Sequence, residues 1–292
     1  MNIAFYTLGC KVNQYETESM REVFMKNGHT VVPDNAPFDA VIINSCTVTA
    51  ESDRKTRQIL NRFRKENPEA IICLTGCMVQ AFADESQALE NADIIIGNTD
   101  VLKVVKSVEN FALNGERIFE VQKHCRTERF NTPPIQKFAE RTRAYMKIED
   151  GCDRFCTYCI IPTARGWVRS KPIEELKSEI AELEKNGFCE IVLVGINLSA
   201  YGTDNGSCLA EAVETAAQFD FSAYDYIVDA VDTVTAKLTL AQEAGRAGIP
   251  IISALSGSRT PTTLPSNSAR TCRAFWRISA VVSPASRRSQ WM

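Results

Sequence analysis

The chain has 292 residues, of which 45% are hydrophobic and 24% are charged, and its formal net charge is −3. This composition is typical of a folded globular protein and excludes a disordered or fibrous chain. The length indicates about two domains. Neither an apolar run long enough to span a bilayer nor a signal-peptide pattern is present, so we expect a cytoplasmic protein without a membrane partner.

Residues 1–115 alternate short apolar runs with helical patterns. The runs are Ile3–Thr7, Ala40–Asn44, Ala70–Thr75 and Asp93–Gly97, and the helical segments are Glu16–Lys26, Ser52–Lys65 and Val101–Leu113. Unbroken apolar runs are typical of strands that are buried on both faces. The alternation therefore predicts an α/β domain, with a parallel sheet covered by helices.

The rest of the chain divides into four segments. Residues 116–140 are polar and contain Pro133 and Pro134, which indicates a linker. Residues 141–220 contain two strand–helix units: Tyr145–Glu149 with Pro172–Lys185, and Glu190–Gly195 with Cys208–Gln218. Residues 221–255 contain one strand–helix–strand unit: Tyr226–Val231, Val234–Ala244 and Ile249–Ser253. Residues 256–292 carry arginines but no acidic residue and lack a consistent period, so we expect a disordered tail.

Three of the eleven cysteines, Cys10, Cys46 and Cys77, each follow a predicted strand. The carboxyl ends of parallel strands meet at one edge of a sheet, and three thiols at one edge can hold an iron–sulfur cluster. Glycine precedes Cys10 and Cys77, where we expect it to let the backbone approach a bulky inorganic ligand. The alternative is that these cysteines are small buried apolar residues, which is our interpretation of Cys73.

A second group, Cys152, Cys156 and Cys159, has the spacing C-x3-C-x2-C. Three thiolates can bind three irons of a [4Fe-4S] cluster and leave the fourth iron open, where S-adenosylmethionine can bind. Zinc is the main alternative, but it prefers four closed ligands, and here neither a second C-x2-C pair nor a nearby histidine is found. The remaining cysteines lack partners at ligand spacing and are interpreted as incidental: Cys125, Cys189, Cys208 and Cys272.

Residues 1–220 resemble the methylthiotransferases, radical S-adenosylmethionine enzymes that modify tRNA. Four segments carry the resemblance: residues 7–14 (TLGCKVNQ), 44–49 (NSCTVT), 75–77 (TGC) and 151–162 (GCDRFCTYCIIP). The first segment and the residues after it are most similar to the branch that acts on threonylcarbamoyladenosine beside the tRNA anticodon.

The resemblance implies two [4Fe-4S] clusters and S-adenosylmethionine. Cys152, Cys156 and Cys159 would hold the radical-generating cluster, and Cys10, Cys46 and Cys77 an auxiliary cluster that supplies sulfur. One S-adenosylmethionine would donate the methyl group, and a second would give the radical that removes hydrogen from C2 of the adenine. The product would be 2-methylthio-N6-threonylcarbamoyladenosine.

The resemblance also implies partners and further site residues. The substrate would be a tRNA, and a flavodoxin- or ferredoxin-like protein would supply electrons. Arg165 matches the Arg-Gly segment of the family after the cysteine loop, and Gly195 and Asn197 match a strand end near S-adenosylmethionine. The basic segment between Arg54 and Lys65 would reach tRNA phosphates, although interspersed acidic residues favour an ordinary solvated helix face.

The resemblance to the methylthiotransferases ends near Asp220, so we expect a truncated radical SAM partial barrel over residues 141–220. Residues 224–237 (YDYIVDAVDTVTAK) instead resemble ubiquitin-activating-like adenylating enzymes, nearest to tRNA threonylcarbamoyladenosine dehydratases, which predicts a Rossmann-like fragment over residues 221–255. We interpret the chain as a junction of two partial reading frames, with methylthiotransferase activity impaired by truncation. The alternative function is a non-catalytic iron–sulfur or zinc binding fragment.

Overall fold

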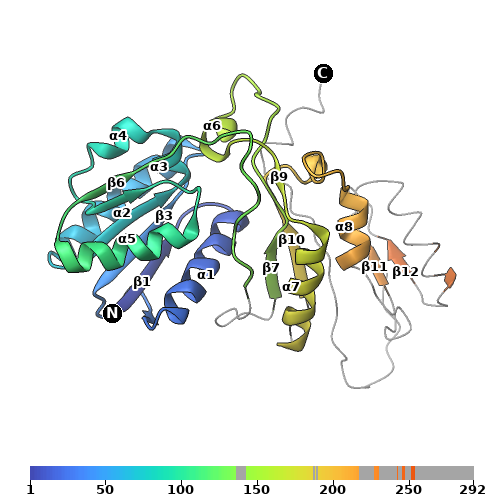
Figure 1. The fold of residues 1–292 in the computed structure, drawn as a ribbon, viewed down its shortest axis with the longest axis horizontal. Coiled ribbons are helices and arrows are strands. Elements are labelled where there is room, and N and C mark those ends of the chain that lie inside the picture. The colour runs from blue at the N-terminus through green and yellow to red at the C-terminus, as the bar shows by residue number, and fades with distance from the viewer. Residues whose placement is uncertain are drawn as a thin grey trace. The chain divides into compact units, whose positions relative to one another are not determined.

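The computed structural model describes residues 1–135, 143–186, 188, 190–216, 227–229, 242, 245–246 and 251–253. Its N-terminal part is a parallel sheet of six strands in the order β2-β1-β3-β4-β5-β6 (Figure 1). The strands are β1 (Asn2–Thr7), β2 (Thr30–Val32), β3 (Ala40–Ser45), β4 (Ile71–Gly76), β5 (Ile94–Ile96) and β6 (Ile118–Glu120). The strand order reverses between β1 and β3, and ligands of such sheets bind outside the carboxyl ends of the strands at this reversal.

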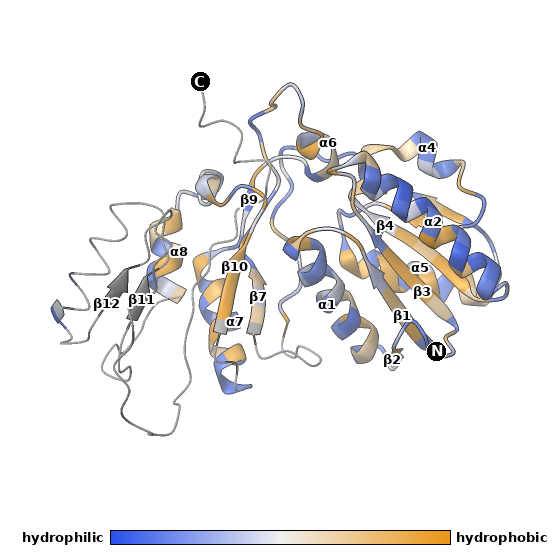
Figure 2. Cartoon of the chain, turned by 180° about the vertical axis from the view of Figure 1, so that it is seen from behind, coloured by the Kyte–Doolittle hydropathy of each residue, from blue (hydrophilic) through white to orange (hydrophobic). Residues whose placement is uncertain are grey.

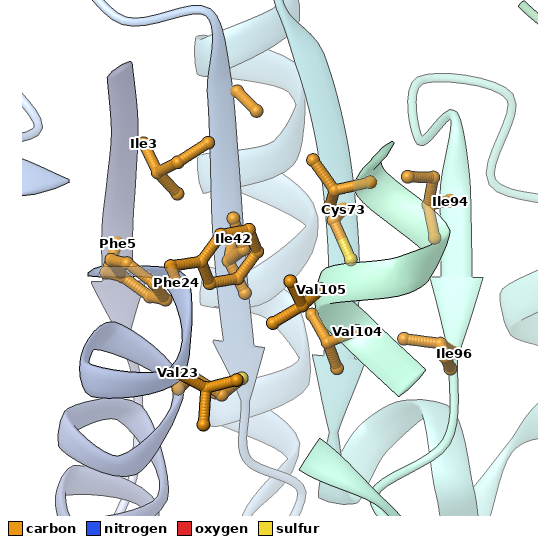
Figure 3. Close-up of a cluster of buried hydrophobic side chains, with 13 residues drawn as sticks. Ile3, Phe5, Val23, Phe24, Ile42, Cys73, Ile94, Ile96, Val104 and Val105 are labelled. Carbon is orange, nitrogen blue, oxygen red and sulfur yellow. The ribbon is translucent and has the colours of Figure 1, made fainter. Parts of the chain in front are cut away.

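Helices cover both faces of this sheet, as the sequence predicts. On one face, α1 (Lys11–Lys26) and α5 (Val101–Asn114) pack on an apolar cluster that includes Phe5, Phe24 and Cys73 (Figure 3). On the other face, α2 (Ala50–Glu66) and α3 (Cys77–Ala81) pack on a second cluster; the short α4 (Ala83–Gln87) follows α3. Cys73 is fully buried in the first cluster, which confirms that it is a core residue.

Besides the short helices α3 and α4, which were not expected, three elements of this domain differ from the sequence prediction. Helix α1 begins five residues earlier than expected, directly after Cys10; Cys10 makes no side-chain cap, so the usual start signal is missing. Strands β2 and β6 were not expected, because each contains only two consecutive apolar residues, whereas the equally short β5 is a run of three isoleucines. Residues 116–140 are therefore not only a linker: β6 pairs with β5, and Ile135 is fully buried.

The next part of the chain contains a second parallel pair, β7 (Arg143–Lys147) and β10 (Glu190–Val194). Between them lie β8 (Glu149–Asp150), α6 (Ile161–Arg165), β9 (Arg169–Ser170) and α7 (Ile173–Lys185), and after them η1 (Leu198–Ala200) and α8 (Leu209–Ala216). Strands β8 and β9 form a short antiparallel pair. The single strand expected at residues 145–149 is divided at Ile148 into β7 and β8. In Figure 2, β3, β4 and β10 are mostly hydrophobic, whereas α2 carries many hydrophilic residues.

Residues 217–276 form a separate compact unit. Its described strands, β11 (Ile227–Asp229) and β12 (Ile251–Ser253), pair in parallel and agree with the two strands expected there. Most of the helix expected at residues 234–244, the tail at 256–292, residues 136–140, Cys189 and Cys272 lie outside the described residues. No helix in the described ranges is long and apolar enough to cross a membrane.

Candidate functional site

The structure brings Cys10, Cys46 and Cys77 to the carboxyl ends of three adjacent strands. Cys10 lies between β1 and α1, Cys46 follows β3, and Cys77 follows β4 as the first residue of α3. Cys46 and Cys77 are only 4% and 3% exposed, and Cys10 is half-buried. The thiols interact electrostatically, since ionisation of Cys46 or Cys10 raises the pKa of Cys77. We therefore treat them as one group, the strand-end cysteines.

A buried cation lies against this group. Burial raises the pKa of Cys77 to about 12, and Arg165 opposes this effect. The Nε of Arg165 donates a hydrogen bond to Cys77 Sγ over 3.0 Å. Burial likewise raises the pKa of Cys46. Metal ligation by these thiols requires loss of their protons, and the adjacent guanidinium favours the thiolate form.

The glycines next to these cysteines make room for protein atoms. A Cβ on Gly9 would stand 2.8 Å from the Cβ of Cys46, and one on Gly76 would stand 2.5 Å from the carbonyl oxygen of Ser45. Both glycines have positive φ, +115° and +100°. These contacts show that the glycines bring the strand-end loops close together; the approach of the backbone to an inorganic ligand stays a prediction.

Replacing Gly76 by alanine is therefore expected to lower the free energy of unfolding by about 1–3 kcal/mol through backbone strain, plus the cost of the displaced Ser45 backbone. Urea unfolding measures this change. Gly115→Ala is the matched control, because Gly115 also has positive φ (+68°) but a Cβ there would meet nothing within 4 Å. Equal losses in the two variants would contradict the close approach at Gly76.

Arg165 also belongs to a network of buried charges. Its Nη2 donates to Glu16 Oε2 over 3.0 Å, and Lys147 Nζ contacts Glu16 at 2.7 Å and Asp150 at 2.6 Å. Asp150 further contacts Arg169 at 3.2 Å. All five side chains are nearly inaccessible to solvent. The network thus connects α1 and the strand-end cysteines to β8, which leads into the Cys152 loop.

The predicted role of Arg165 as a cofactor residue stays a prediction, but its position is now known: it contacts Cys77 and Glu16. Sequence reasoning missed the other members of the network, Glu16, Lys147 and Asp150. The signal that could have found two of them is the charge pattern of residues 147–150, since charged residues are unusual next to a buried strand and are normally paired there.

Cys152, Cys156 and Cys159 lie on the loop between β8 and α6. The Cys152 backbone N–H donates to the Gly166 carbonyl over 2.9 Å, and the Cys159 N–H donates to the Cys156 carbonyl over 2.9 Å. Cys156 is exposed, and the other two are half-buried. The three loop cysteines are therefore more accessible to solvent than the strand-end cysteines.

The end of β10 contacts this loop. Asn197 Nδ2 is 3.8 Å from Cys152 Sγ, and the Asn197 backbone N–H donates to Glu149 Oε2 over 2.6 Å. A Cβ on Gly195 would stand 2.7 Å from the same Glu149 oxygen and 2.7 Å from Leu198 Cδ2, so a larger residue would have to displace these side chains. The structure thus brings Asn197 beside Cys152, while the position of Gly195 and Asn197 near S-adenosylmethionine stays a prediction.

Glu149 is a residue that sequence reasoning missed. It is fully inaccessible to solvent, and its Oε1 has no hydrogen-bond partner among the described residues. Burial raises the pKa of Glu149 to about 8, although the backbone N–H groups of Asn197 and Ile196 oppose this.

The basic residues of α2 are paired with neighbouring acidic groups. Arg54 contacts Glu51 at 2.6 Å, and Arg64 contacts Asp93 at 2.5 Å. These pairs support the interpretation of α2 as a solvated helix face.

No three His, Cys, Asp or Glu side chains in the described residues are arranged to hold a single metal ion. A cubane cluster is larger than a single ion and holds its ligands farther apart, so this finding concerns mononuclear sites. The donor set of both cysteine groups, three thiols each, fits an iron–sulfur cluster.

Two family models match the chain. Residues 2–97 match Uncharacterized protein family UPF0004, and residues 146–251 match the Radical SAM superfamily. The chain is 39% identical over 202 residues to Threonylcarbamoyladenosine tRNA methylthiotransferase MtaB of Bacillus subtilis (69% of this chain, 45% of that protein). It is 43% identical over 214 residues to the MtaB of Thermotoga maritima (71% and 47%). The chain belongs to the radical SAM methylthiotransferase family.

Another member of this family is similar along the same part of the chain. The tRNA-2-methylthio-N(6)-dimethylallyladenosine synthase of Thermotoga petrophila is 35% identical over 227 residues, which cover 75% of this chain and 50% of that protein. The chain therefore spans about half the length of the curated relatives it matches. Both cysteine groups of this radical SAM protein lie within or at the edges of the matched segments.

The radical SAM match extends to residue 251, beyond the limit near residue 220 that we expected from the sequence. It therefore includes most of residues 221–255, for which we expected a Rossmann-like fragment; the resemblance of that segment to adenylating enzymes stays a prediction. Among solved structures, the radical S-adenosylmethionine methyltransferase TsrM of Kitasatospora setae, with cobalamin and a [4Fe-4S] cluster bound, has a TM-score of 0.50 at 10% identity, covering 73% of this chain and 50% of that chain. This likeness concerns the fold alone.

Proposed function

We propose that this chain carries the catalytic part of a tRNA methylthiotransferase, which adds a methylthio group to C2 of N6-threonylcarbamoyladenosine beside the anticodon. The names of the relatives from Bacillus subtilis and Thermotoga maritima support this substrate. The proposal includes two [4Fe-4S] clusters, S-adenosylmethionine and a flavodoxin- or ferredoxin-like electron donor.

The observation that carries the proposal is the presence of two separate thiol groups, each of three cysteines, joined by one buried charge network. The strand-end cysteines lie beside Arg165, whose guanidinium offsets the negative charge of ligating thiolates. The loop cysteines follow Asp150, which shares that network through Lys147. Two clusters in one chain match a reaction that needs both a radical source and a sulfur source.

When bound at the loop cysteines, a cluster with an open iron supplies the reductive cleavage of S-adenosylmethionine. Cys152, Cys156 and Cys159 would hold it, and Cys10, Cys46 and Cys77 would hold the auxiliary cluster. Asn197 contacts Cys152 through its side-chain amide and so helps to orient that ligand. Because Gly195 has no side chain, the Glu149 carboxylate can lie directly against its backbone.

Anaerobic reconstitution, followed by iron counting and an assay for 5′-deoxyadenosine, tests the proposal. We expect about eight irons per chain, four in each cluster, and 5′-deoxyadenosine when S-adenosylmethionine and a reductant are added. Cys46→Ala and Cys156→Ala should each lose about half of the iron, because each removes a ligand of a different cluster. Only Cys156→Ala should abolish formation of 5′-deoxyadenosine.

Cys208→Ala is the control for these variants, because Cys208 is an exposed free cysteine outside both groups; its iron content should equal that of the wild type. Unchanged iron in Cys156→Ala would show that the cluster assignment is wrong. Bound iron or zinc without formation of 5′-deoxyadenosine in the wild type would favour the alternative, a non-catalytic metal-binding fragment.

A further inference from the structure

An exposed cluster of aromatic rings and arginine lies beside the loop cysteines. Phe155 is 56% exposed although it is a large apolar residue. Its ring lies 5.2 Å from that of Trp167, centroid to centroid, in an edge-to-face arrangement. The guanidinium of Arg126 lies 5.1 Å from the Trp167 ring. We call these three residues the stacking platform: Phe155 lies on the loop that precedes α6, Trp167 follows α6, and Arg126 lies on the segment between β6 and β7.

The backbone holds this platform in place. Phe155 has φ +45° and is the only described non-glycine residue with positive φ, a conformation that costs free energy and is found mostly at functional sites. The backbone of Trp167 packs against Gly151, where a Cβ would stand 2.0 Å from the Trp167 carbonyl oxygen. Phe155 is therefore part of the cysteine loop, and Trp167 packs against Gly151 at the start of that loop.

Arg126 is also held by fixed neighbours. It belongs to a turn in which the Glu128 N–H donates to the Cys125 carbonyl over 3.3 Å. The Glu128 carboxylate contacts His124 at 2.8 Å and Arg169 at 3.1 Å. The Glu128 side chain thus connects this turn to His124 and to the buried Arg169, while the Arg126 side chain itself is exposed.

The exposed charged residues next to the platform along the chain are mainly positive. Arg154, Arg129 and Lys123 are exposed near the platform in the sequence, against one exposed acidic residue, Asp153. The carboxylate of Glu128 is already paired. Basic groups attract phosphates, and exposed aromatic rings interleaved with arginine stack on unpaired nucleobases. An acidic protein would pair with the positive charges, but that pairing would not use the exposed Phe155 ring or the half-buried Trp167 ring.

Resting on the proposed function, we infer that Phe155, Trp167 and Arg126 stack an unpaired base of the RNA loop next to the adenosine that is modified. The platform would hold the loop open beside the cysteines, so it is a positioning surface and touches no reacting atom. It would act on single-stranded loops and have no effect on paired stems, because bases in a duplex hide their faces from stacking.

The test uses the full reconstituted chain and a labelled RNA hairpin with the sequence of an anticodon arm, compared with a duplex of equal length. Trp167→Leu and Arg126→Gln should weaken hairpin binding by about 10- to 100-fold and leave duplex binding unchanged. A hairpin with 2-aminopurine beside the target adenosine should lose fluorescence when it binds the wild type, and Trp167→Leu should remove this quenching.

Arg62→Gln is the matched control, because the Arg62 guanidinium also lies over a ring, that of Phe63, at 4.8 Å, but on α2. It should bind the hairpin as the wild type does. The iron content of each variant shows whether the cysteine loop is intact. If Trp167→Leu loses iron, Trp167→Phe is used in its place; because it keeps an aromatic ring, it should bind the hairpin at near wild-type strength.

Three results would overturn the inference: hairpin binding unchanged in both platform variants, equal loss of hairpin and duplex binding, or wild-type chain that does not bind the hairpin. Loss of binding to a flavodoxin in Trp167→Leu, with hairpin binding intact, would assign the surface to the electron donor. If the hairpin stacks on the platform but 5′-deoxyadenosine does not form, the inference about the platform holds and the proposed function is contradicted. If 5′-deoxyadenosine forms but the hairpin does not bind, the inference about the platform is contradicted and the proposed function holds.

Discussion

Glu16→Gln is expected to lower the free energy of unfolding by about 3–5 kcal/mol, because it leaves buried cations without their partner. Burial alone would raise the pKa of Glu16, but Arg165 and Lys147 more than offset this and hold its pKa below the ordinary value. The carboxylate is therefore charged in the folded protein. Removing that charge leaves Asp150 to balance Arg165, Lys147 and Arg169.

Urea unfolding of the metal-free chain measures this loss. Glu174→Gln is the control, since Glu174 forms an exposed pair with Lys177 at 2.9 Å, and such pairs contribute less than about 1 kcal/mol. The double variant Glu16→Gln/Lys147→Met should be less destabilised than the sum of its single changes, because it removes one anion and one cation together. A loss below about 1 kcal/mol in Glu16→Gln would show that the network does not hold α1 against β7 and β8.

The second large effect concerns pH and Glu149. Because burial raises the pKa of Glu149 to about 8, the folded chain keeps a proton that the unfolded chain loses near pH 4.5. Unfolding between these two values releases that proton, so stability is greatest below the lower value and falls as pH rises towards 8. The full loss is about 5 kcal/mol, and about 2 kcal/mol of it falls between pH 6 and pH 8.

Glu149→Gln should remove this dependence, since an amide does not titrate. The difference in unfolding free energy between pH 6 and pH 8 should therefore shrink by about 2 kcal/mol in the variant, as measured by urea unfolding of the metal-free chain at both values. Glu184→Gln, at an exposed position of α7, should leave the difference as in the wild type. Parallel pH curves for wild type and Glu149→Gln would contradict a protonated carboxyl at this site.

Two neighbouring buried carboxyls, Glu149 and Asp150, have pKa values shifted in opposite directions. Glu149 and Asp150 are adjacent in the chain, yet Asp150 is surrounded by Lys147, Arg165 and Arg169, which hold its pKa below the ordinary value against the effect of burial. Glu149 accepts hydrogen bonds from backbone N–H groups, and burial together with the charge of Asp150 raises its pKa against the opposing effect of these groups and of Lys147. The difference in partners, rather than in burial, separates the two carboxyls.

Local patterns in the sequence were sufficient for most of the N-terminal domain. Strands β1, β3 and β4 appear as apolar runs because both their faces are buried, and the positions of Cys10, Cys46 and Cys77 follow from where those runs end. The C-x3-C-x2-C spacing is equally local. Strand β6 escaped prediction, because it contains only two consecutive apolar residues and is positioned by its pairing with β5.

Long-range partners were decided only by the tertiary structure. Arg165 and Cys77 are 88 positions apart, and Arg165 and Glu16 are 149 apart; no spacing in the chain signals either contact. The unpartnered oxygen of Glu149 and the rings of Phe155 and Trp167 depend in the same way on how separate segments pack. The reason is physical: periodicity records which face of an element is buried, whereas the partner of a buried charge is whichever group the packing brings within reach.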